Sequence, residues 1–176
     1  MPAFNSQLND PCAILACGCP ILPLRSSVNG PAPKLAEGKS DFIDEAFDLF
    51  RANVLFSNFE IKTPADRTLT FCILYISRCL REIEKCSDAV DAQKILYMLS
   101  NKTLAVPGSN NYTLSKVFPA PENKKEADLY ISYMNQIREE INNRIPLYIF
   151  KDGEWSKKWW MTFSKTNFMN LTLPLY

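Results

Sequence analysis

The chain has 176 residues, a formal net charge of +1, no histidine and only five glycines. This length fits a single domain (1–176) with a substantial core, and the near-neutral charge gives no general attraction to nucleic acid or acidic membranes. Without histidine the commonest general base and metal ligand are missing, and no glycine-rich phosphate-binding loop occurs. We therefore expect no enzyme activity, no catalytic residues, no cofactor and no metal site.

The six cysteines fall into two groups, Cys12, Cys17 and Cys19 near the start and Cys72, Cys79 and Cys86 at seven-residue steps. Neighbours in the second group would lie roughly 10 Å apart along a helix, too far for a disulfide. We interpret them as small buried hydrophobic residues in a reducing compartment. The first group could hold a metal in principle, but it lacks paired C-x-x-C spacing. Because no secretory leader pattern or membrane-length apolar run occurs, we expect a cytoplasmic protein.

Residues 1–38 are predicted to form an extended, proline-rich arm rather than a helix. The apolar content of the arm is too high for a free disordered tail, so we expect it to lie against its own core or against a partner. The sequence leaves both options open. Within the arm we predict that Leu22, Leu24 and Arg25 are partner contacts.

The remainder, 39–176, is predicted to form a helical body. A first helix begins at Ser40 or Asp41 and places apolar residues from Ile43 to Val54 at helical spacing. A second spans about 64–86, with Thr63 as its cap and Pro64 in the first position. Apolar side chains occupy almost its whole circumference, whereas a surface helix would have a polar face. We therefore expect this helix to be central and surrounded by the others.

Three further helices are predicted. The third is capped by Ser87 or Asp88 and is followed by a long loop over 101–122. Its expected buried patch consists of Ile95, Leu96, Met98 and Leu99. The fourth begins near Asn123 with a capping box completed by Glu126, and Pro146 ends it or closely follows its end. After a turn at Asp152-Gly153, Ser156 caps a last helix that runs to about Met169. About five helices without an alternating strand pattern predict an all-α fold.

The last predicted helix combines lysines with tryptophans. Adjacent residues on a helix point about 100° apart, so one of Trp159 and Trp160 should be in the core and the other available. With Lys157 and Lys158 they form a second predicted partner-binding surface. An alternative is a freestanding module that binds anionic membrane or single-stranded nucleic acid through this helix.

Several blocks of the sequence together resemble a known family, subunit 3 of the actin-related-protein-2/3 complex, the seven-subunit nucleator of branched actin filaments. The resemblance rests on their order and spacing along most of the chain. The blocks are MPAFNSQL at the start, GPAP at Gly30–Pro33, DEAFDLFRANVLFSNFEIK at Asp44–Lys62, ADRTL at Ala65–Leu69, LYIS at Leu74–Ser77, and KWW and NFMN near the end.

The resemblance implies an all-helical subunit without catalytic activity of its own. It implies a position beside the actin-related protein 3 subunit and near the mother filament, in the actin cytoskeleton. ATP binding then belongs to the actin-related subunits. We accordingly expect the other subunits and the actin filament as partners, with no nucleic acid and no insertion into a membrane.

Overall fold

Four α-helices form the body of the protein in a computed structural model that describes residues 3–151, 154–155 and 160–173. They are α1 (Phe42–Asn53), α2 (Pro64–Ile83), α3 (Ala89–Ser100) and α4 (Lys124–Ile149), followed by the short 3-10 helices η1 (Met161–Phe163) and η2 (Phe168–Asn170). Two antiparallel pairs of two-residue strands accompany them, β1 (Leu15–Ala16) with β2 (Cys19–Pro20) and β3 (Phe150–Lys151) with β4 (Glu154–Trp155). The fold is thus mostly helical rather than purely all-α.

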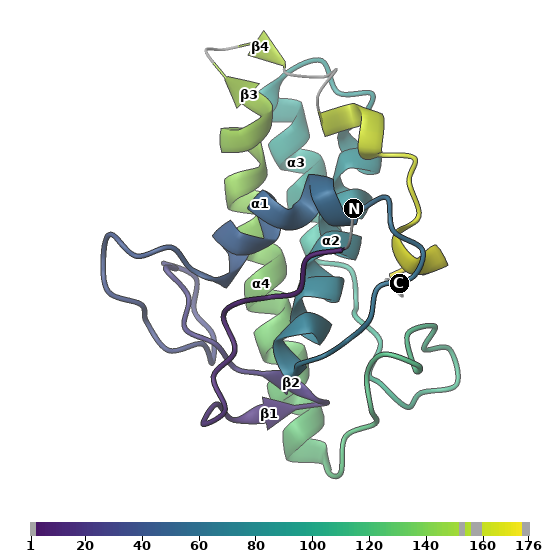
Figure 1. Cartoon of the computed structure of the whole chain (residues 1–176). Helices are drawn as coiled ribbons and strands as arrows, with labels where there is room; N and C mark the ends of the chain where they lie inside the picture. The colour runs from purple at the N-terminus through teal and green to yellow at the C-terminus, as the bar shows by residue number, and fades with distance from the viewer. Residues whose placement is uncertain (1–2, 152–153, 156–159, 174–176) are drawn as a thin grey trace.

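Helices α2, α3 and α4 run side by side, and α1 crosses in front of them (Figure 1). Helix α2 contacts each of the other three helices, β2 and η1. Its largest buried side chains include Phe71, Tyr75 and Leu69. Buried Thr70 donates its hydroxyl to the Asp66 carbonyl at 2.8 Å, which satisfies a polar group that has no access to water. Helix α2 therefore supplies many of the buried side chains among the described residues.

The starts of the four helices agree with the sequence prediction because each is encoded locally. Asp41 caps α1 by accepting the Ile43 and Asp44 N–H groups, and the Asp44 side chain completes a capping box. Pro64 begins α2 and the Asp66 carboxylate accepts the Thr63 N–H at 2.9 Å, but the Thr63 hydroxyl has no hydrogen-bond partner among the described residues, so the predicted Thr63 side-chain cap does not form. Asp88 caps α3 by accepting the Asp91 N–H. Such caps satisfy N–H groups that have no partner within the helix.

Helix α4 begins as predicted but differs from the prediction in its capping box and at its C-terminal end. Asn123 caps it as expected, but the Glu126 carboxylate accepts the N–H groups of Glu122 and Cys17 instead of completing a capping box. At the other end Pro146 lies inside the helix, which continues to Ile149. The predicted stop at Pro146 is wrong because packing outweighs the proline penalty of about 3 kcal/mol: Ile145 and Ile149 are buried, and the adjoining Tyr148 ring stacks on Phe47 at 4.2 Å.

Within the described residues the predicted last helix does not run on to Met169: Trp160 is helical, and the two 3-10 turns η1 and η2 follow it. Arg81 of α2 explains why, because its guanidinium donates to the Ser164 carbonyl at 2.6 Å and the Thr166 carbonyl at 2.8 Å, groups that a continuous helix would use itself. Met169 and Asn170 then adopt a positive φ of 54°. The predicted cap Ser156 and the predicted turn at Asp152-Gly153 lie outside the described residues.

The predictions for the loop over 101–122 and for the buried patch of α3 are each confirmed in part. The loop over 101–122 is irregular, as expected, yet Leu104, Tyr112, Leu114 and Phe118 are buried in the core. On α3 the predicted apolar patch is only half right, since Leu96 and Leu99 are buried, Ile95 is half-buried and Met98 is exposed. Part of α3 therefore faces solvent with apolar side chains.

The cysteines are free thiols, and all except Cys12 are buried. Among the described residues no group of three or more potential ligand side chains is arranged to hold a metal ion. Burial, with a smaller effect of Glu126, raises the pKa of Cys17 to about 12. Burial also raises the pKa of Cys19, Cys72 and Cys79 well above the ordinary value of 9.0. The buried thiols are therefore protonated at neutral pH and poor nucleophiles.

We expect iodoacetamide to label one thiol per native molecule, at Cys12, because only that side chain combines exposure with access for the reagent. In denaturant all six should react. Peptide mapping by mass spectrometry before and after unfolding measures this directly. Rapid native labelling of Cys17 or Cys19 would show that the arm does not stay packed on the body.

Candidate partner-binding surfaces

One face of α4 binds the arm through polar side chains at helical spacing. These are Glu126, Tyr133, Gln136, Glu140 and Arg144, which recur at steps of seven, three, four and four residues and so share one side of the helix. Each contacts a different part of the arm, and we call this set the arm-binding face. It is what positions the arm relative to the body.

The part of the arm-binding face nearer the start of α4, from Glu126 to Gln136, forms hydrogen bonds with the backbone of the arm. The Glu126 carboxylate accepts the Cys17 N–H at 2.8 Å, and the Tyr133 hydroxyl accepts the Leu22 N–H at 3.1 Å. Gln136 uses both ends of its amide, accepting the Ala32 N–H at 2.9 Å and donating to the Val28 carbonyl at 3.0 Å. Gly30 allows this close approach, because a Cβ there would overlap the Gln136 side chain.

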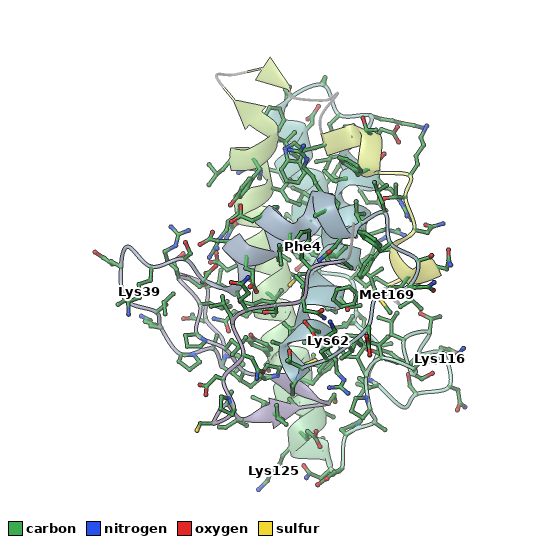
Figure 2. All side chains as sticks on the ribbon, in the orientation of Figure 1. Phe4, Lys39, Lys62, Lys116, Lys125 and Met169 are labelled. Atoms are coloured by element: carbon green, nitrogen blue, oxygen red, sulfur yellow. The ribbon has the colours of Figure 1, made fainter. Side chains whose placement is uncertain are left out.

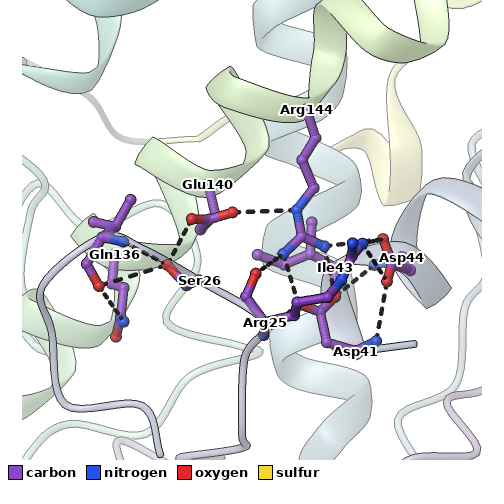
Figure 3. Close-up of polar contacts among 9 residues, drawn as sticks. Arg25, Ser26, Asp41, Ile43, Asp44, Gln136, Glu140 and Arg144 are labelled. Atoms are coloured by element: carbon purple, nitrogen blue, oxygen red, sulfur yellow. Dashed lines mark hydrogen bonds and ion pairs between the residues drawn. The ribbon is translucent and has the colours of Figure 1, made fainter. Parts of the chain in front are cut away.

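The rest of the arm-binding face is a charged cluster around Arg144, which lies between α4, the arm and the start of α1 (Figure 3). Its guanidinium contacts both carboxylate oxygens of Asp41 at 2.6 Å, one oxygen of Asp44 at 2.9 Å and one of Glu140 at 3.2 Å. It also donates to the Arg25 carbonyl at 2.8 Å. All five N–H donors of the guanidinium are thereby used.

The contacts of the cluster favour the charged forms of Asp41 and Arg144. Burial disfavours the charged form of Asp41, but hydrogen bonds from Arg144 and from the backbone N–H groups of Asp44 and Arg25 outweigh it, so the pKa of Asp41 lies below its ordinary value of 3.8. Burial alone would lower the pKa of Arg144, but its carboxylate partners, Asp41 foremost, raise it. Ser26 adds a hydroxyl that donates to Glu140 at 2.5 Å.

The start of the chain is held by a second set of contacts. Asn53 of α1 pairs with the backbone of Phe4, accepting its N–H at 2.8 Å and donating to its carbonyl at 2.7 Å. The fully buried Asp66 carboxylate accepts the Ser6 N–H at 2.8 Å, and Glu45 accepts the Ser6 hydroxyl at 2.6 Å. Both ends of the arm are thus anchored on the chain's own helices.

These contacts determine which of the predicted partner residues in the arm are buried and which are exposed. Leu22 and Leu24 are buried in the chain's own core, so they offer little surface in the isolated chain, and their role as partner contacts stays a prediction. Arg25 is different, because its side chain remains 51% exposed while an ion pair with Asp44 at 3.1 Å orients it. The physical reason is geometric, since Leu24 points toward the body and its neighbour Arg25 toward solvent.

Arg25 borders an open hollow of about 380 Å³. The hollow is lined also by Glu140, Arg144, Tyr148 and the exposed Leu147 of α4. It therefore combines an oriented cation with an exposed apolar side chain at the edge of a rigid cluster. Among the arm residues predicted to bind partners, Arg25 is the one with the position and exposure to do so.

The second predicted surface is only partly visible. Lys157, Lys158 and Trp159 lie outside the described residues. Trp160 is buried, stacked on Phe50 with ring centroids 5.7 Å apart, so it belongs to the core of this chain. This agrees with the expectation that one of the two tryptophans is a core residue.

Sequence reasoning missed the arm-binding face. Its signal was present, because Tyr133, Gln136, Glu140 and Arg144 form a polar stripe beside the apolar stripe of the same helix. A polar stripe usually indicates a solvated face. Here the arm covers it, and only the contacts over about a hundred residues of sequence separation reveal this.

Comparison with known proteins places the whole chain in one family. A family model described as "P21-Arc: ARP2/3 complex ARPC3 (21 kDa) subunit" matches residues 1–173. The protein named actin-related protein 2/3 complex subunit 3 in Arabidopsis thaliana is 39% identical over 158 residues, which is 90% of this chain and 91% of that protein. The protein of that name in Dictyostelium discoideum is 38% identical, covering 97% of this chain and 99% of its own length.

The relative from Schizosaccharomyces pombe, of the same name, is 36% identical and covers 98% of this chain and all of its own length. Matches at these identities extend over the arm, the four helices and the C-terminal turns alike. The chain therefore belongs to the P21-Arc family, the family of ARP2/3 complex subunit 3.

Proposed function

We propose that this chain is a non-catalytic structural subunit of an actin-related-protein-2/3 complex, which supports actin nucleation and the assembly of branched actin filaments. The observation that carries the proposal is membership of the family over residues 1–173. The partners we propose are the actin-related protein 3 subunit, the other subunits of the complex and the mother filament. The proposed location is the cytoplasmic actin cytoskeleton.

The packing of the arm supports a scaffold role. Arm, α1 and α4 are joined by an ion cluster that leaves Arg25 exposed in one orientation. An oriented side chain loses less conformational entropy on binding than a free one. We propose Arg25 as a partner contact on these grounds, and we retain Lys157, Lys158 and Trp159 as proposed contacts from the sequence.

The alternative, a freestanding module for anionic membrane or single-stranded nucleic acid, is less well supported. Trp160 is in the core rather than available for stacking. Figure 2 shows Lys39, Lys116 and Lys125 on three separate segments, namely the loop before α1, the loop over 101–122 and the start of α4. No helix of the described residues is long and apolar enough to cross a membrane.

A native pull-down tests the proposal. The tagged full-length chain, captured from cytosol, should retain two actin-related proteins and a fixed set of small subunits through washes at low and at high salt. Interfaces with an apolar centre lose little affinity with ionic strength, whereas lysine contacts to polyanions weaken steeply. Recovery of lipid or nucleic acid that is lost at high salt, without actin-related proteins, would contradict the proposal.

A further inference from the structure

The hairpin that joins β1 to β2 turns through Cys17 and Gly18, whose φ angles are both positive, at 49° and 73°. Two-residue hairpin turns favour this conformation, which suits glycine. Cys17 carries a Cβ and is strained there, and its side chain is fully buried. Strained residues persist where the surrounding structure fixes them, so the contacts of this hairpin turn with the rest of the chain decide its conformation.

Arg67, near the start of α2, joins the hairpin turn to the loop over 101–122. Its Nε donates to the Val117 carbonyl at 2.9 Å, and its Nη1 donates to the Gly18 carbonyl at 3.4 Å. The hairpin turn and the loop also pack directly on each other, because a Cβ built on Gly18 would lie only 3.0 Å from the ring of Pro119. A residue larger than glycine therefore fits here only if the turn or the loop moves.

Glu126, in the first turn of α4, joins the same two segments. One oxygen of its carboxylate accepts the Cys17 N–H at 2.8 Å, and the other accepts the N–H of Glu122, at the end of the loop, at 2.7 Å. The hairpin lies beside both helices, since β1 contacts α4 and β2 contacts α2 (Figure 1). Arg67 and Glu126 thus each bind the hairpin turn and the loop at once, so that moving either segment removes a contact from both side chains.

We propose that the hairpin turn and the loop over 101–122 form one conformational unit, coupled through Arg67 and Glu126, which opens from the helices and closes on them as a whole. Such coupling is reciprocal, because a change that favours the open form of one segment favours it equally in the other. A partner that binds the loop at Lys116, which is exposed (Figure 2), thereby also stabilises the hairpin turn. The coupling is a property of the single chain and does not depend on the proposed function.

Hydrogen exchange of the full-length chain, followed by mass spectrometry of its peptides, measures the coupling. Gly18→Ala places a Cβ against Pro119 at a positive φ. We expect exchange to rise about tenfold or more, by the same factor, in peptides from the hairpin and from the loop over 101–122. Gly38→Ala is the matched control, because Gly38 also has a positive φ, of 80°, but nothing lies within 4 Å of its Cβ. It should change neither segment, and a rise in the hairpin alone after Gly18→Ala would overturn the proposal.

The reverse direction uses the buried cysteines as probes. Gly108→Ala perturbs the loop, since φ there is 88° and the new Cβ would lie 2.7 Å from the Cβ of Ala120. It should accelerate native iodoacetamide labelling of Cys17 and Cys19 about tenfold, while Cys79 of α2 stays protected. Unchanged labelling of the two arm cysteines would overturn the proposal. Equal acceleration at Cys79 would also overturn it, because the whole chain would then be opening rather than one unit.

Arg67→Met tests one of the joining side chains and leaves the glycines in place, so it decides the question even if Gly18→Ala does not fold. Methionine keeps an apolar stem but cannot donate to either carbonyl, and we expect exchange to rise in the hairpin and in the loop together. The control is Arg78→Met, the same substitution on the same helix at a residue paired with Glu82, which should raise exchange in neither segment. Unchanged exchange in either segment after Arg67→Met, or equal effects of the two substitutions, would contradict the proposal.

Discussion

Replacing Arg144 by methionine should lower the free energy of unfolding by about 3–5 kcal/mol. Methionine keeps most of the apolar stem but removes the guanidinium that neutralises Asp41, Asp44 and Glu140. Because Asp41 is fully buried, its carboxylate would then be charged and without its cation in a site of low polarity. Urea denaturation followed by circular dichroism measures the change.

Arg25→Met is the matched control. Arg25 also pairs with Asp44, at 3.1 Å, but its side chain is half exposed to water. Exposed ion pairs contribute about 0–1 kcal/mol, so this variant should remain close to wild type. Equal effects of the two substitutions would mean that the Arg144 cluster is not buried as described.

The pH dependence of the Arg144 variant provides a second measurement. The wild-type pKa of Asp41 is lowered on folding, so the stability that this group contributes is present above its ordinary pKa of 3.8 and is lost as pH falls through its lower folded value. In Arg144→Met burial is no longer opposed by the guanidinium, and the folded pKa rises. The stability difference between the two proteins should therefore be largest at neutral pH and shrink below about pH 4. A difference that stays constant across this range would contradict the cluster's ionised state.

The second large effect is expected from Leu24→Ala, which should lower the free energy of unfolding by about 2–5 kcal/mol. Leu24 is 1% exposed, and its backbone is held between Pro33 and Leu35 by hydrogen bonds of 2.9 and 3.1 Å. The fixed backbone prevents collapse around the missing side chain, so a cavity remains. Because the arm is joined to α4 at several points, we expect the whole chain to unfold in a single cooperative transition, and this transition should show the loss of stability.

Leu15→Ala is the control for this prediction. It makes the same substitution in the same arm at a position that is 49% exposed. It should change the free energy of unfolding by no more than about 0.5 kcal/mol. If Leu24→Ala has the same free energy of unfolding as wild type yet fails to join the complex, the prediction that Leu24 is a partner contact would be supported. Loss of stability in the isolated chain supports its place in the core.

The starts of the helices followed directly from the sequence because their determinants are local. Asp41, Asp88 and Asn123 each accept N–H groups two or three residues further along the chain, and Pro64 suits a first helical position because it has no N–H to leave unpaired. The apolar periodicity of the segments between them indicated which sides are buried. The apolar side chains around almost the whole circumference of α2 likewise predicted its extensive burial. The family resemblance added the expectation that the chain is part of a complex, which neither the helix caps nor the apolar periodicity can indicate.

The tertiary structure decided what depends on distant residues. The cation of Arg144 and the carboxylate of Asp41 are 103 positions apart, so nothing local distinguishes their stripe on α4 from a solvated face. Leu24 and Arg25 are adjacent in sequence, yet one is core and the other is exposed, because α4 covers only one side of the arm. Pro146 stays within a helix, whereas residues 161–170 form two short 3-10 turns rather than a continuous helix, since packing on Phe47 and hydrogen bonds from Arg81 to backbone carbonyl groups outweigh local preference. The sequence by itself determined where helices begin and which faces are apolar; the three-dimensional packing determined which polar groups meet, because their pairing energies arise only after the chain has folded.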